Sequence, residues 1–231
     1  GYAINSNDAN GTVAIGYEAL MDLTDGQYNT ALGMSSGYNI TAGNQNTLLG
    51  YQALYQATGT SDTTCVGYQS GYYATGSYNT YIGNKAGKSA SGANGSYNVA
   101  VGDNALLSLT TGNKNIAIGY QAADAMTTGV WNVAIGYQAM TTNTTGYGNV
   151  GIGERSLNAL NSSDDSTTEA TYNTAVGRTS GLAVTTGERN TLLGAGSGQG
   201  INEGDMNTLI GAYAGENITT GSNNIALGHH I

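Results

Sequence analysis

A short apolar segment that ends in glycine recurs along the chain, and its spacing limits the folds that the chain can adopt. One copy reads NTALG at positions 29–33, and another reads NIAIG at positions 115–119. Most neighbouring copies are 17 residues apart, and the remaining intervals are 16, 19 and 24 residues. A period of this length is too short for a pair of helices, so each copy predicts one turn of a solenoid. The closing glycines are Gly16, Gly33, Gly50, Gly67, Gly83, Gly102, Gly119, Gly136, Gly153, Gly177, Gly194, Gly211 and Gly228.

The repeat predicts an all-β fold, a parallel β-solenoid of about 13 turns with one short strand in each turn. We expect a single repeat domain over residues 1–231, which is typical of a segment of a longer fibre. The interval between Gly153 and Gly177 is 24 residues rather than 17. Because insertions in solenoids map to exposed loops, this interval predicts an inserted loop over residues 158–170.

The strand positions divide between two faces, because side chains alternate along a strand. The residues on either side of the middle position are Val, Ile, Leu or Thr, and we expect them to line the interior of the turn. The middle residue is also mostly apolar, and a strand that is apolar on both faces is buried on both. We therefore predict that the middle residue meets another copy of the chain, the alternative being that it packs on the return segment of its own turn. The predicted oligomer seam consists of Ala31, Ala100, Ala117, Ala134, Ala175 and Ala226.

Asparagine stands four residues before the closing glycine in eleven of the thirteen copies. Its short amide can bond the backbone at a corner and can stack on its equivalents in the turns above and below. This column predicts a structural asparagine ladder rather than a row of sugar-binding residues. Its members are Asn29, Asn46, Asn79, Asn98, Asn115, Asn132, Asn149, Asn173, Asn190, Asn207 and Asn224.

Tyrosines form two further columns, one after the closing glycine and one before the asparagine. Buried aromatic rings carry a large apolar area, so we expect these columns to cover the core or the oligomer seam. The alternative is a face that stacks on carbohydrate or binds a protein. The first column contains Tyr17, Tyr51, Tyr68, Tyr120 and Tyr137, and the second contains Tyr28, Tyr78, Tyr97, Tyr147 and Tyr172 with Trp131.

Charge and composition argue against several classes of function. The chain has 15 acidic and 6 basic residues, so a net charge of −9 offers no basic surface to nucleic acid or to an anionic membrane. No apolar run approaches the length of a membrane span, so we expect no membrane insertion. Calcium-binding solenoids carry an aspartate in nearly every turn, and no such column exists here. We expect no catalytic residue, no cofactor and no metal, and therefore no enzyme.

The repeat resembles the head repeats of trimeric autotransporter adhesins and the repeats of phage tail fibres. The copies that carry the resemblance read NVAIGYQA at positions 132–139 and NVAVGDNA at positions 98–105. The resemblance implies a left-handed parallel β-roll, a homotrimer, and a role in attachment to a host or cell surface. It also implies an extracellular, cell-surface or virion location. The repeat is longer than that of the adhesin heads, which favours the tail-fibre type.

Three hypotheses follow for function. The first is a non-enzymatic, homotrimeric fibre or adhesin segment that binds itself and a surface receptor or glycan. The second is an ice-binding solenoid, suggested by a threonine column that includes Thr24, Thr41 and Thr185. The third is an extracellular matrix filament whose subunits stack end to end.

The inserted loop is the candidate receptor-binding element. Its acidic residues Asp164, Asp165 and Glu169 could hold a cation or meet a basic patch on a receptor. The alternative is an insertion that the solenoid tolerates and that binds nothing.

Overall fold

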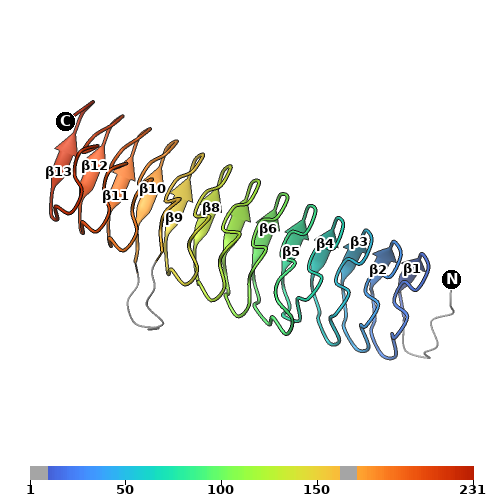
Figure 1. The fold of residues 1–231 in the computed structure, drawn as a ribbon. Helices are drawn as coiled ribbons and strands as arrows, with labels where there is room; N and C mark the ends of the chain where they lie inside the picture. Colours follow the sequence, from blue (N-terminus) through green and yellow to red (C-terminus); the bar gives the residue numbers. More distant parts are fainter. Residues whose placement is uncertain (1–9, 162–170) are drawn as a thin grey trace. The chain divides into compact units, whose positions relative to one another are not determined.

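A computed structural model describes residues 10–161 and 171–231 of the chain. The chain divides into two compact units, one that ends at Asn113 and one that begins at Lys114 (Figure 1). Each unit is a stack of coils, and each coil contributes one strand of three residues. The described residues form no helix. The predicted parallel β-solenoid with a repeat of about 17 residues is confirmed.

The strands lie directly before the closing glycines. In the first unit they are β1 (Val13–Ile15), β2 (Thr30–Leu32), β3 (Thr47–Leu49), β4 (Thr64–Val66), β5 (Thr80–Ile82) and β6 (Val99–Val101). In the second unit they are β7 (Ile116–Ile118), β8 (Val133–Ile135), β9 (Val150–Ile152), β10 (Thr174–Val176), β11 (Thr191–Leu193), β12 (Thr208–Ile210) and β13 (Ile225–Leu227).

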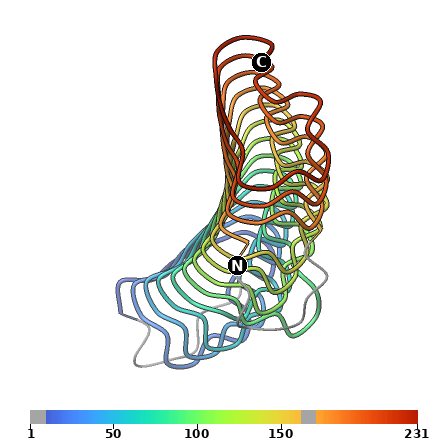
Figure 2. The ribbon, with the colours of Figure 1, turned by 90° about the vertical axis from the view of Figure 1, so that its left-hand side faces the viewer.

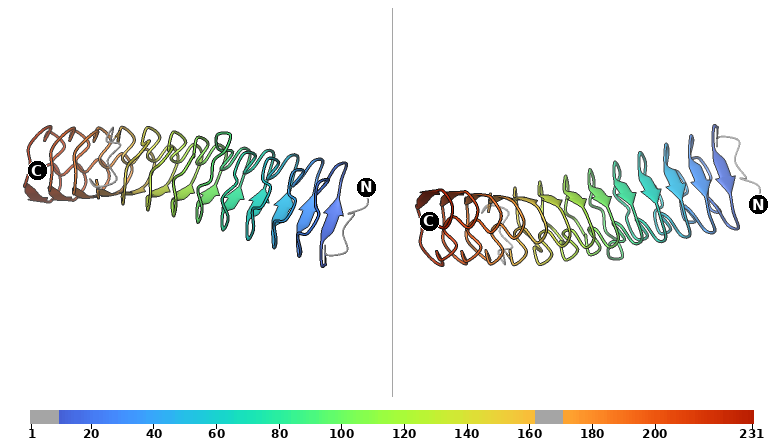
Figure 3. Two further views of the ribbon diagram at one scale, coloured as in Figure 1. Left: turned by 90° about the horizontal axis from the view of Figure 1, so that it is seen from below. Right: turned by 90° about the horizontal axis from the view of Figure 1, so that it is seen from above.

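Neighbouring strands within each unit pair in parallel and in register, so equivalent residues of successive coils face each other. Ala31 of β2, for example, is opposite Leu48 of β3. The backbone N–H of Gly33 donates to the carbonyl oxygen of Ile15 in the preceding coil at 2.8 Å, and that of Thr30 donates to Asn46 in the following coil at 2.8 Å. The strands of each unit therefore run along one edge of the coils (Figure 3).

Each strand ends where the chain turns through a conformation that only glycine adopts easily. Gly33 has φ +141°, and a Cβ atom added to it would lie 2.4 Å from the carbonyl oxygen of Gly50 in the next coil. Two further bends follow in each coil, at the second and fourth residues after the closing glycine. The coil of Gly33 has Gly37 (φ 63°) at the fourth position, but the next coil has ordinary residues in the left-handed region at both, Gln52 (φ 53°) and Leu54 (φ 51°). Such residues cost of order 1–3 kcal/mol each, so the stacking of the coils must hold them in place.

The core of each unit is built from a few inward columns, and successive coils repeat the same path in Figure 2. The middle strand residue points inward, as do the fourth and seventh residues after the closing glycine. In one coil these are Leu48, Leu54 and Ala57, each at most 1% exposed. The seventh-residue column was not recognised from the sequence, although it is also apolar in most coils, as at Ile40 and Leu109.

The asparagine column forms a continuous hydrogen-bonded ladder within each unit. The Nδ2 of Asn46 donates to the Oδ1 of Asn29 at 2.9 Å and to the carbonyl oxygen of Thr60 at 2.8 Å. The Oδ1 of Asn46 accepts a hydrogen bond from the backbone N–H of Thr63. The backbone N–H of Asn46 donates to the Oδ1 of Asn29. Because these amides are buried, water cannot replace a hydrogen bond that is not formed, and the unpaired polar group would destabilise the fold. The ladder therefore fixes the register of the coils.

A second polar column stands two residues before the asparagines and was not singled out from the sequence. Its side-chain oxygens accept hydrogen bonds from the backbone N–H of the preceding coil. Ser61 accepts from Asn44 at 3.0 Å, and Ser77 accepts from Ser61 at 3.1 Å. These bonds occupy backbone donors at the corner where the coil has no strand.

Core volume is exchanged between the middle strand residue and the fourth residue after the glycine. Tyr81 is a fully buried middle residue, and its coil has Gly87 at the fourth position. A Cβ atom at Gly87 would lie 2.4 Å from the Tyr81 ring. The next coil reverses the sizes, with Ala100 in the strand and a buried Leu106 at the fourth position. The exchange also reaches across coils, because a Cβ atom at Gly37, whose own coil has Ala31, would lie 2.7 Å from Leu48 in the next coil.

We expect Gly87→Leu alone to destabilise the first unit by about 1–3 kcal/mol through overpacking, and Tyr81→Ala alone by about 3–5 kcal/mol through a cavity. The double variant reproduces the Ala100 and Leu106 arrangement and should be more stable than Tyr81→Ala. Leucine tolerates the left-handed backbone there, because Leu106 has φ 50°. Urea unfolding of the three variants measures the coupling, and strictly additive losses would contradict the proposed exchange of volume.

Candidate functional site

The outward face of the strands is an exposed surface rich in aliphatic side chains in each unit. It is formed by the residues on either side of the middle strand position. In the first unit Leu32 and Leu49 are 44% and 43% exposed, and in the second unit Leu193 is 47% exposed. Val13, Ile15, Ile82, Ile116 and Ile118 are exposed in the same way. We call this surface the strand face.

The predicted seam is wrong, because the alanines lie inside the coils. Ala31, Ala100, Ala117, Ala134 and Ala175 are 0% exposed within a single chain, and only Ala226 in β13 is partly exposed. The flanking residues, predicted to point inward, point outward instead. The physical reason is the asparagine ladder. Asn29 is buried two residues before Ala31, and side chains two residues apart on an extended segment share a face, so the middle strand residue points inward as well. The alternative that the middle residue packs within its own turn is therefore the correct one.

Two aromatic columns border the strand face. Most of their rings are exposed, so the columns do not cover the core, and their expected place at an oligomer seam stays a prediction. Tyr51 and Tyr68, which follow closing glycines, stack with ring centroids 5.3 Å apart, and Tyr78 and Tyr97, which precede asparagines, stack at 4.8 Å. Rings stacked in this way cover each other's faces and present their edges to solvent. Because a sugar stacks on an exposed ring face, this geometry favours the structural interpretation of the columns over the carbohydrate-binding one.

Trp131 occupies the second aromatic column in the second unit. The Nζ of Lys114 lies 5.0 Å from its ring centroid, and Tyr147 packs edge to face against it at 4.9 Å. Tyr147 in turn packs against Tyr172 at 5.8 Å. The two faces of Trp131 thus have neighbours from the adjoining coils, which again indicates packing rather than an open platform.

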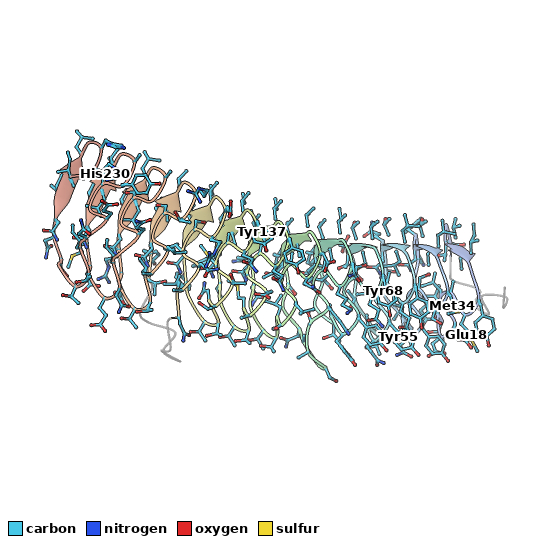
Figure 4. The ribbon with its side chains drawn as sticks, turned by 45° about the horizontal axis from the view of Figure 1, so that its top comes forward. Glu18, Met34, Tyr55, Tyr68, Tyr137 and His230 are labelled. Atoms are coloured by element: carbon cyan, nitrogen blue, oxygen red, sulfur yellow. The ribbon has the colours of Figure 1, made fainter. Side chains whose placement is uncertain are left out.

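A third aromatic column was missed in the sequence. Tyr38, Tyr55 and Tyr72 are the fifth residues after their closing glycines, and each is partly exposed. Their ring centroids are 5.1 Å apart in both successive pairs. Burial raises the pKa of Tyr55, and the nearby Tyr38 and Glu18 raise it further. The 17-residue spacing of these tyrosines in the sequence was a visible signal of this column. In Figure 4, Tyr55 is drawn toward the edge of the first unit that faces away from the strands.

Comparisons with family models, with curated proteins and with solved structures find no match to this chain. The resemblance of the repeat to adhesin heads and tail fibres therefore stays an expectation.

The threonines of the column that suggested ice binding use their hydroxyls for hydrogen bonds between coils, while their side chains remain at least partly exposed. The Oγ1 of Thr24 donates to the carbonyl oxygen of Thr41 in the next coil at 3.0 Å, and that of Thr41 donates to Thr58 at 3.2 Å. In the second unit the Oγ1 of Thr185 donates to the carbonyl oxygen of Asn202 at 3.2 Å. These donors link coils to each other, which favours a structural role for the column.

No group of three or more histidine, cysteine, aspartate or glutamate side chains with the geometry of a metal site occurs in residues 10–161 and 171–231. His230 places its Nδ1 2.9 Å from the Oε1 of Glu216 and stacks on Tyr213, with ring centroids 4.9 Å apart. Cys65 is fully buried, and this burial raises the pKa of its thiol, so it is held in the neutral form. The part of the chain that the structure describes contains no helix long and apolar enough to span a membrane.

The candidate receptor-binding residues Asp164, Asp165 and Glu169 lie outside the described residues. Residues 158–161, which are the part of the predicted 158–170 loop that the structure describes before its gap, still pack as part of the stacked coil. Leu160 is 0% exposed, and the backbone N–H of Asn161 donates to the carbonyl oxygen of Thr185 at 3.0 Å. Residues 158–161 therefore belong to the stacked coil, and the rest of the predicted 158–170 loop up to residue 170 lies outside the described residues.

Proposed function

We propose that the chain is a non-enzymatic fibre segment that assembles as a homotrimer through the strand face and serves attachment at a cell or virion surface. The observation that carries the proposal is the strand face of each unit, whose last strand position is Val, Ile or Leu in every coil. Soluble monomers rarely expose large contiguous apolar patches, and such patches usually mark interaction surfaces. The assignment of three chains, the attachment role and the extracellular location rest on the resemblance of the repeat.

The energetics of the strand face suit association along its length. Full burial of an aliphatic side chain is worth roughly 1.5–3 kcal/mol, so a side chain that is already half buried has about 1 kcal/mol left to gain. Every coil supplies one such side chain at its last strand position, and six of the thirteen strands supply a second at the first position, where the other seven have Thr. The columns repeat in register with the coils. A second copy that runs parallel and in register meets the same residue types at every level, so the gain accumulates with the number of coils.

Charge placed on the strand face should separate the chains without unfolding them. We expect the double variant Leu49→Asp and Leu193→Asp to convert the trimer to a monomer, because each carboxylate would lose water on assembly with no partner. Its circular dichroism should remain that of the parent. Multi-angle light scattering on both proteins measures the mass.

The matched control is Asn94→Asp with Asn217→Asp, which adds the same charge at exposed positions outside the strand face. It should remain trimeric. A parent protein with the mass of one chain would exclude self-association through the strand face, and an open-ended polymer would favour the end-to-end filament instead.

A further inference from the structure

The tyrosine column formed by Tyr38, Tyr55 and Tyr72 repeats over three successive coils of the first unit. The Tyr38 and Tyr55 rings are 28° from parallel, and the Tyr55 and Tyr72 rings are 14° from parallel. After burial, the nearby Tyr38 contributes to the raised pKa of Tyr55, in keeping with the short distance between their rings. Each phenol therefore has another phenol as its neighbour in the next coil.

The backbone beneath the column is held from coil to coil. The N–H of Asn39 donates to the carbonyl oxygen of Tyr55 at 3.2 Å, and that of Gln56 donates to the carbonyl oxygen of Tyr72 at 2.9 Å. Leu54 and Ala57, on either side of Tyr55, are fully buried. The backbone that carries the rings is thus held in place, while the broad χ2 torsion of tyrosine still lets each ring rotate.

The column is partly exposed and lies outside the strand face, so it remains accessible whether or not the chains associate. One end is closed by the Tyr73 ring, which contacts Tyr72 edge to face at 4.5 Å, and by the Nζ of Lys88 at 5.8 Å from the Tyr72 centroid. The ring faces are therefore covered, whereas ring edges with their hydroxyls and ortho carbons can be reached from solvent. This geometry disfavours sugar stacking and suits chemistry at the ring edge.

We propose that Tyr38, Tyr55 and Tyr72 form an oxidative cross-linking site, at which neighbouring rings join as dityrosine when the fibre meets a one-electron oxidant. Each of two phenols gives one electron to the oxidant and its hydroxyl proton to water. The two radicals form a carbon–carbon bond between ortho carbons, and the hydrogen on each of those carbons moves to its oxygen. The net change for each bond is the loss of two electrons and two protons, and the oxidant takes up both electrons.

A bond between Tyr38 and Tyr55 would close a loop of one coil, and a bond between Tyr55 and Tyr72 would close the next. A covalent link of this kind restricts the unfolded chain and raises stability, as a disulfide does. The chain has one cysteine and therefore no disulfide of its own. Dityrosine would thus supply covalent links between coils.

The test exposes the full chain to photogenerated ruthenium(III) tris-bipyridine, a small one-electron oxidant, and maps the products by mass spectrometry after cleavage at aspartate. Asp62 separates Tyr55 from Tyr72, so their cross-link joins two peptides. A bond between Tyr38 and Tyr55 lies within one peptide and lowers its mass by two hydrogens. We expect these two products to dominate, with the denaturing-gel mass of one chain and a raised urea midpoint.

The decisive variant is Tyr55→Phe, which keeps the stack but removes the shared phenol. It should lose most of the dityrosine, whereas Tyr97→Phe, in the separate Tyr78 and Tyr97 pair, should retain it. The proposal is overturned if Tyr55→Phe gives as much dityrosine as the parent. It is equally overturned if the urea-unfolded chain gives the same products in the same yield, or if the links join different chains. None of these results bears on the trimer.

Discussion

Ala134→Asp should unfold the coils around β8, whereas Ile135→Asp, one residue later, should leave them folded. Ala134 is 0% exposed, so its replacement places a carboxylate inside a coil that has no cation to pair with it. The cost of burying such a group is several kcal/mol, and part of it would appear as a raised pKa of the new carboxyl. Ile135 lies on the strand face and is partly exposed, so a carboxylate there keeps its water in the single chain.

Urea unfolding followed by circular dichroism, at a concentration where the chains are dissociated, separates the two variants. The midpoint of Ala134→Asp should fall far below that of the parent, and the midpoint of Ile135→Asp should stay close to it. If Ile135→Asp instead lowered the urea midpoint more than Ala134→Asp, the flanking strand residues would point inward, as the sequence had predicted. Hydrogen exchange at β8 and β9 would show whether the loss is confined to the neighbouring coils.

Asn190→Asp should be the most damaging isosteric change in the ladder, and its effect should depend on pH in an unusual direction. The Nδ2 of Asn190 donates to the Oδ1 of Asn173 at 3.0 Å and to the carbonyl oxygen of Gly204 at 2.8 Å. A carboxylate cannot donate, and it would place a buried charge against these two oxygens. The loss of two buried hydrogen bonds alone is worth roughly 2–6 kcal/mol.

The direction of the pH effect follows from the pKa of the introduced carboxyl. Burial and the two facing oxygens favour the protonated form, so the folded-state pKa lies above the unfolded value of about 3.9. A group with a raised folded pKa is least harmful below the unfolded pKa, and its penalty grows as the pH rises toward the folded pKa. The difference in unfolding free energy between Asn190→Asp and the parent should therefore be smallest in acid. Asn190→Ala serves as the control, since its deficit should not vary with pH.

The period of the repeat predicted the solenoid, and the reason is geometric. A segment that returns every 17 residues with glycine at its end leaves space for one strand and one return path. The asparagine column was also interpretable, because a short amide at a corner can bond both the backbone and its equivalents in the neighbouring coils. Both arguments depend on spacing and on hydrogen-bonding capacity, which the sequence states directly.

The orientation of the strand was not predictable from hydrophobicity, because both faces are apolar. The observation that decides the orientation is that side chains two residues apart on an extended segment point to the same face. Asn29 and Ala31 are two residues apart on a strand, so they share a face, and a buried ladder at Asn29 forces Ala31 inward as well. The Tyr38, Tyr55 and Tyr72 column was equally regular, but it lies on the irregular return path, where no simple period tells which side chains face solvent.

The asparagine ladder also gives each unit an electrical direction. In the second unit Asn207 donates to Asn190, and Asn224 donates to Asn207, so every side-chain carbonyl in this run points toward the later coil. Parallel strands contribute little net dipole, because their bonds to the two neighbours oppose each other. The amide dipoles of the ladder do not cancel. They add along the axis as peptide dipoles add along an α-helix, with the positive end toward the earlier coils and the negative end toward the later ones. A stack of coils without any helix thus acquires the polarity of one, from its side chains alone.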